Sequence, residues 1–141
     1  MTTTDQYLFF NRQTGQMRLV ERTEKISVSL KKNGYCCLLF IAPLQIKSAP
    51  VIPIGLMDKY MSFHAVKTAS ISPDGQFLQI PLADGGRFGF AVEKSRPIQK
   101  IYANGQPVAW KSNREIAAED GLEYCEAELS GKGLQTVVIQ L

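Results

Sequence analysis

The chain has little of what metal binding and catalysis usually require. His64 is the single histidine in 141 residues, and no HxH, HExxH or CxxC spacing accompanies it. Metal ligands would therefore have to come from scattered positions. No nucleophile elbow is present, and the DGG at 84–86 lies between expected strands and opens no helix, so hairpin geometry explains it better than phosphate binding. We expect no metal, no cofactor and no catalytic residue.

Long basic tracts and long apolar runs are also missing. The net charge is +3, and Lys31 and Lys32 are the only adjacent basic pair, so no surface for nucleic acid or lipid is indicated. No apolar run approaches the ~20 residues of a membrane helix. The N-terminus, MTTTDQ, lacks the basic and apolar regions of a signal peptide, so we expect a cytoplasmic protein.

Cysteine is scarce and unevenly placed. Cys36 and Cys37 are neighbours that point to opposite sides of an extended chain, and Cys125 lies in another segment. We interpret all three as free thiols that fill a core rather than as a redox pair. A single domain over residues 1–141 is long enough to fold without disulfides.

Short β-prone segments separated by turn residues make up most of the chain. The expected strands lie at 6–10, 16–20, 26–30, 35–42, 63–72, 77–82, 88–92, 98–102, 107–111, 123–129 and 134–141. Turns about every ten residues predict an all-β fold, an antiparallel β-sandwich of about eight to ten short strands. Only residues 113–120 have any helical character.

Two neighbouring segments differ from this simple pattern. Both faces of the strand expected at 35–42 are apolar, so a single sandwich core cannot cover it. The segment 43–57 contains Pro43, Pro50 and Pro53, which predicts a long, extended loop because proline lacks a backbone donor.

Turn residues predict the pairing of the later strands. Asn104-Gly105 favours a type I′ hairpin in which Ile101 opposes Val108 and Gln99 opposes Trp110, so that Trp110 faces the core. We expect hairpins at 84–86 and 130–133 as well.

Carboxylates are interpreted as turn-forming or solvated groups. They include Asp74 and Asp84 before glycines, and Glu123, Glu126 and Glu128 in one late strand.

The order of several segments resembles one known family. DQYLFFNRQTGQMRLV, ISVSLKKNGYCCLLFIAPL, PIGLMDKY and GRFGFAVEKSRPIQKIYANGQPVAW follow one another along the chain. This order is similar to the C-terminal β domain of raffinose synthases and alkaline α-galactosidases in glycoside hydrolase family thirty-six. The resemblance covers nearly the whole chain, and it departs at residues 61–64, where the family has a glycine-rich stretch.

The resemblance implies a non-catalytic accessory domain. In such enzymes the catalytic carboxylates belong to a (β/α)₈ barrel that precedes the β domain and acts on α-galactosides, and no position here matches them. The barrel would then be the partner that covers the doubly apolar strand. Without the barrel, the same surface would favour self-association.

Two other interpretations remain open. The first is a carbohydrate-binding module that stacks sugar rings on exposed aromatic residues, with Tyr60 and Tyr102 as the candidate binding residues. The second is an independent enzyme that uses an unrecognised pair of carboxylates, or a cysteine with His64.

Overall fold

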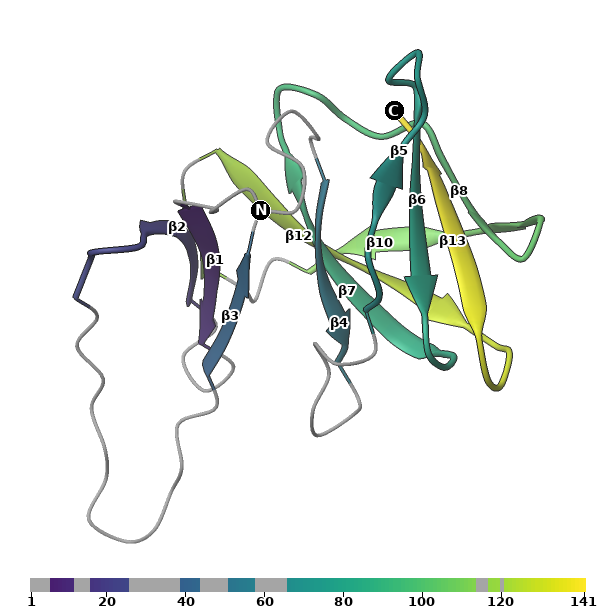
Figure 1. Cartoon of the computed structure of the whole chain (residues 1–141), viewed down its shortest axis with the longest axis horizontal. Coiled ribbons are helices and arrows are strands. Elements are labelled where there is room, and N and C mark those ends of the chain that lie inside the picture. Colours follow the sequence, from purple (N-terminus) through teal and green to yellow (C-terminus); the bar gives the residue numbers. More distant parts are fainter. Residues whose placement is uncertain are drawn as a thin grey trace, which may run out of the picture.

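The computed structural model describes residues 6–11, 16–25, 39–43, 51–57, 66–113, 117–119 and 121–141. These residues contain no helix, which confirms the predicted all-β class (Figure 1). The strands are β1 (Gln6–Asn11), β2 (Gln16–Glu21), β3 (Leu39–Pro43), β4 (Val51–Leu56), β5 (Ser70–Ile71), β6 (Phe77–Leu82), β7 (Gly86–Glu93), β8 (Lys100–Ala103), β9 (Gln106–Val108), β10 (Trp110–Ser112), β11 (Ala117–Ala118), β12 (Leu122–Leu129) and β13 (Gln135–Gln140). They exceed the expected eight to ten because several are only two or three residues long.

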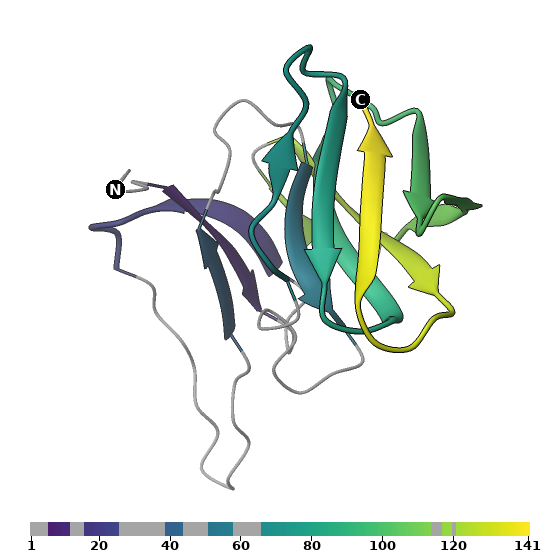
Figure 2. The same cartoon turned by 45° about the vertical axis from the view of Figure 1, so that its right-hand side comes forward.

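The strands form three sheets. The N-terminal sheet has the order β11-β2-β1-β3, the central sheet β10-β12-β7-β4 and the C-terminal sheet β5-β6-β13-β8-β9. All neighbouring strands are antiparallel except β11, which pairs parallel to β2. Figures 1 and 2 show the central sheet between the other two, so the domain is a sandwich with a third sheet added on its N-terminal side.

Two hydrophobic cores lie on opposite faces of the central sheet. The first core joins the central and C-terminal sheets and includes Phe88, Phe90, Ile80 and Ile139. The rings of Phe88 and Phe90 lie 5.2 Å apart. The second core joins the central and N-terminal sheets, where the rings of Phe10 and Tyr124 stack at 5.6 Å. Aromatic burial of this kind is a large part of what holds such layers together.

Strand β7 is buried on both faces, with large side chains on one face and small residues on the other. Phe88, Phe90 and Val92 face the first core, whereas Ala91 faces the second. Gly89 lies on the same side as Ala91, and a Cβ atom there would come within 2.6 Å of Met57 Cγ and 2.8 Å of Tyr124 Oη. The missing side chain therefore lets the second core pack closely on β7.

The predicted doubly apolar strand at 35–42 lies mostly outside the described residues. Leu39 to Pro43 form β3, which pairs with β1 so that Phe40 is opposite Phe10. Burial on both faces is instead observed in the central sheet, where five of the six residues of β4 and five of the eight residues of β7 are buried.

The prediction of a long proline-containing loop at 43–57 was partly wrong. Pro43 ends β3, and Val51–Leu56 form β4 with Pro53 inside the strand. Among the described strands β4 is an edge of the central sheet, and its register against β7 shifts between Pro53 and Gly55. An edge position and a bulge are the places where a strand tolerates proline.

Two of the predicted hairpins were also wrong. Strands β6 and β7, and likewise β12 and β13, are consecutive in sequence but belong to different sheets. The two connections are tied together by Asp84, whose Oδ1 atom accepts hydrogen bonds from the backbone N–H groups of Gly85 and Gly133, both at 2.8 Å. The turn residues therefore form crossovers between sheets, which local turn signals cannot distinguish from hairpins.

The hairpin at Asn104-Gly105 is confirmed. Both residues have positive φ, 50° and 80°, as a type I′ turn requires. Ile101 is opposite Val108, as predicted.

Of the other local predictions, some are confirmed, some are wrong and one lies outside the described residues. The opening hairpin, β1 with β2, is confirmed. The prediction of helical character at 113–120 is wrong for Ala117–Ala118, which pair with β2 as a short strand. Of the strand expected at 63–72, the structure shows β5 and an isolated bridge between Val66 and Leu82. The strand at 26–30 lies outside the described residues.

Candidate functional site

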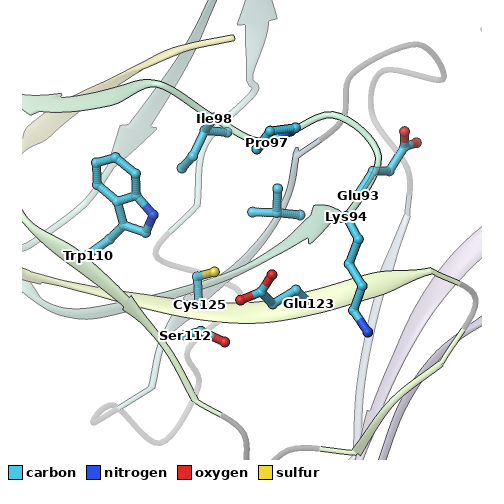
Figure 3. A pocket seen from close by; sticks show the side chains of 9 residues that line it. Glu93, Lys94, Pro97, Ile98, Trp110, Ser112, Glu123 and Cys125 are labelled. Atoms are coloured by element: carbon cyan, nitrogen blue, oxygen red, sulfur yellow. The ribbon is translucent and has the colours of Figure 1, made fainter.

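A pocket of about 130 Å³ lies at the end of the first core, where β7 ends (Figure 3). Strands β10 and β12 form one wall with Trp110, Ser112, Glu123 and Cys125. The connection between β7 and β8 forms the other wall with Lys94, Pro97 and Ile98. Val92 and Glu93, at the end of β7, complete the lining.

Strand register brings these side chains together. Ser112 is opposite Cys125, and Trp110 is opposite Ala127, which belongs to the first core. Cross-strand partners share a face of a sheet, and so do residues two apart in one strand. Trp110, Ser112, Cys125 and Glu123 therefore project to the same side of the central sheet.

The position of Trp110 corrects the hairpin register predicted beyond Val108. Trp110 is not opposite Gln99, because the chain leaves the C-terminal sheet after β9 and joins the central sheet as β10. The side chain packs against the first core but is only partly buried, so Trp110 is both a core neighbour and a wall of the pocket. An aromatic residue at the mouth of a pocket can contact a ligand, which a fully buried one cannot.

Three polar side chains at the pocket have no hydrogen-bond or ion-pair partner among the described residues. Within the part of the chain that the structure describes, the side chains of Glu123, Lys94 and Ser112 make no hydrogen bond and no ion pair. In Figure 3 the carboxylate of Glu123 lies beside the sulfur of Cys125, and the nitrogen-bearing edge of the Trp110 indole is turned toward them. The carboxylate of Glu123 and the indole N–H of Trp110 thus face one small space, whereas the ammonium of Lys94 points away from it in Figure 3.

The thiol of Cys125 is almost fully protonated at neutral pH. Its thiol is free and buried. Burial, and then the negative charge of Glu123, raise the pKa of the thiol to about 11. At pH 7 only about one molecule in 10⁴ would carry the reactive thiolate. Free thiol character is thus confirmed for Cys125, whereas Cys36 and Cys37 lie outside the described residues.

The carboxylates at the pocket do not form a catalytic pair. Glu123 points toward Cys125, whereas the carboxylate of Glu93 points away from the pocket in Figure 3. Glycoside hydrolysis needs two carboxyl groups that flank one bond. No group of three or more His, Cys, Asp or Glu side chains that could hold a metal ion occurs within the described ranges. The pocket thus presents one carboxylate, that of Glu123, to a ligand.

The predicted sugar-stacking residues lie elsewhere. Tyr102 is a half-buried residue of β8, on the face of the C-terminal sheet opposite to the buried Ile101, and its register partners are Val138 and Pro107. It is not part of the pocket at Trp110. Tyr60 and His64 lie outside the described residues, so their roles stay predictions.

One buried polar cluster was not predicted. Glu126 is buried rather than solvated, with 8% of its surface exposed. Tyr124 Oη donates a hydrogen bond to Glu126 Oε1 at 3.0 Å, and Arg87 Nε lies 3.8 Å from the same oxygen. The sequence contained a signal, since Tyr124 and Glu126 are two residues apart and must share a face. The phenol and the guanidinium offset the cost of burying the carboxylate, so we assign this cluster to stability.

Comparison with protein-family models and with curated proteins finds no match for this chain. The described residues also contain no helix with the length and apolar character needed to cross a membrane.

Proposed function

We propose that this chain is the non-catalytic accessory β domain of a glycoside hydrolase of the α-galactosidase or raffinose synthase type. Its role would be to pack against the catalytic (β/α)₈ barrel and stabilise it. The order of motifs along the sequence supports this proposal. The observation that carries it is the layered packing of the described strands, in which the central sheet is covered on both faces.

The N-terminal sheet is the side on which we expect the barrel. The reason is that this sheet contains β3, the described end of the doubly apolar segment at 35–42. On β1, Phe9 faces away from the second core but is itself already buried, with 2% of its surface exposed. The guanidinium of Arg18 lies 5.7 Å from the centre of the Phe9 ring.

The opposite side of the domain is less suited to such a contact. Strand β6 of the C-terminal sheet alternates buried core residues with exposed ones such as Gln79, the pattern of a solvated sheet face. Among the described residues, the exposed large hydrophobic side chains are Phe77 and Leu134. They lie near opposite ends of the sheet, because Phe77 is opposite Gln140 and Leu134 precedes Gln135. Self-association of the isolated chain, which we also propose, would therefore have to use another surface.

The proposal includes a role in carbohydrate metabolism and a cytoplasmic location. The free, buried thiol of Cys125 supports the location, because free cysteines persist in reducing compartments.

An antiserum against this chain tests the proposal. Cell extract would be separated by gel filtration, and each fraction would be immunoblotted and assayed with a chromogenic α-galactoside. We expect a reactive band far larger than the 15.7 kDa of this chain, in the fractions that contain the activity. The purified chain should show no turnover of the same substrate. A band at the mass of this chain, in fractions without activity, would contradict the proposal.

A further inference from the structure

We propose that the pocket between Trp110 and Glu123 binds one pyranose ring of a neutral carbohydrate. This inference goes beyond the accessory role and does not depend on it. A domain that supports a barrel needs no ligand pocket, and a free-standing domain could have one.

The first argument is the pairing of a donor with an acceptor. The indole N–H of Trp110 can only donate a hydrogen bond, and the carboxylate of Glu123 can only accept one. Neither has a partner within the described part of the chain, and the nitrogen-bearing edge of the indole is turned toward Glu123 (Figure 3). A hydroxyl group both accepts and donates, so a diol satisfies the two groups together. Ser112 also lines the pocket, whereas the ammonium of Lys94 points away from it in Figure 3.

The second argument is the apolar part of the lining. Val92, Pro97 and Ile98 line the pocket together with the ring of Trp110. A pyranose ring has C–H groups that pack on such a surface while its hydroxyls reach polar groups. The volume of about 130 Å³ is of the order of one sugar ring.

Charge disfavours the simplest alternatives. A small cation would satisfy Glu123 but would leave the Trp110 N–H without an acceptor. An anion would be repelled by Glu123, which already disfavours ionisation of Cys125. A neutral ligand with several hydroxyl groups avoids both penalties.

The pocket is largely formed before a ligand binds. Trp110, Ser112, Glu123 and Cys125 stand on paired strands, and Pro97 restricts the backbone of the facing connection. Binding would therefore order few groups, which favours affinity for a small ligand.

Tryptophan fluorescence provides a direct test, because Trp110 is the only tryptophan in the chain. Methyl α-D-galactopyranoside and methyl α-D-glucopyranoside would be titrated separately to about 100 mM, with N-acetyltryptophanamide as the control for bulk effects. We expect a saturable change in Trp110 emission for at least one glycoside, with a Kd of about 1–10 mM, the range for a single ring with few hydrogen bonds. Absence of a saturable change with both glycosides would overturn the proposal.

Two matched variants locate the binding. Glu123→Gln removes the charged acceptor and should weaken binding about tenfold. Glu128→Gln makes the same chemical change on the same strand, at an exposed residue outside the pocket, and should leave the Kd unchanged. Equal Kd values for Glu123→Gln and the unmodified chain would count against the assigned site. Saturation by tetramethylammonium rather than by either glycoside would overturn the assignment of a neutral ligand.

Discussion

Replacement of Gly89 by alanine tests whether the N-terminal and central sheets pack as the structure shows. Gly89 lies on β7, on the side that faces the second core. An added methyl group would come within 2.6 Å of Met57 Cγ, 2.8 Å of Met57 Sδ and 2.8 Å of Tyr124 Oη. Met57 can move, because its side chain is flexible. Tyr124 is more restrained, because its ring stacks on Phe10 and its hydroxyl donates to Glu126.

The expected cost follows from two opposing terms. Overpacking a filled core costs about 1–3 kcal/mol. Replacing glycine by alanine within a strand returns about 0.5–1 kcal/mol, because the unfolded chain loses conformational freedom. We therefore expect Gly89→Ala to lower the free energy of unfolding by about 1–2 kcal/mol. In a domain of this size, the melting temperature should fall by about 3–7 °C.

Urea denaturation followed by Trp110 fluorescence measures this change. The same substitution in a Met57→Ala background is the control, because removing the Met57 side chain opens space for the new methyl group. The cost of Gly89→Ala should then fall by at least about 0.5 kcal/mol. An unchanged or increased stability of Gly89→Ala, or the same cost in both backgrounds, would refute the close packing of β7 against the second core.

Three further predictions concern single side chains. In a variant whose other cysteines are serine, native Cys125 should be alkylated with a rate that rises toward a midpoint near pH 11, and Glu123→Gln should lower that midpoint; a midpoint near 8.5 would contradict this. Asn104→Ala should cost about 2 kcal/mol in urea denaturation, because the φ of 50° disfavours alanine and two side-chain hydrogen bonds to the start of β13 are lost; Asn104→Asp, which keeps one acceptor, should cost less. The pKa of Asp74 is held below its ordinary 3.8, first by the hydroxyl of Ser72 and then by the backbone N–H of residue 76. A carboxylate whose folded-state pKa is lowered stabilises the fold above pH 3.8, and this stabilisation is lost as the pH falls through the folded-state pKa. Asp74→Asn should therefore melt earlier than the unmodified chain at pH 7, and the difference should shrink as the pH is lowered below 3.8; a difference that does not change with pH would contradict the assignment.

Local signals in the sequence predicted strands well and their partners less well. Alternating residues and turn formers located β6, β7, β12 and β13 to within about two residues. The Asn104-Gly105 turn also fixed the partner of Ile101. It could not do the same for Trp110, because nothing local marks the point after β9 where the chain changes sheets.

The candidate pocket illustrates the same limit. Trp110 and Glu123 were noted separately, as a core residue and as a solvated acid. They are neighbours only because β10 pairs with β12, a contact between segments about ten residues apart that no turn signal specifies. The raised pKa of Cys125 likewise depends on its burial and on Glu123, both of which follow from tertiary packing.

The sequence by itself determined that this is an all-β domain, where many of its turns lie and which residues alternate toward a core. Those properties depend on φ and ψ preferences and on the two-residue period of a strand, which are local. Tertiary structure alone decided that the described strands form three sheets, that the central sheet is covered on both faces and that the turns at 84–86 and 130–133 cross between sheets. Those outcomes depend on which apolar faces bury each other, and the free energy of that burial is shared among residues far apart in the chain.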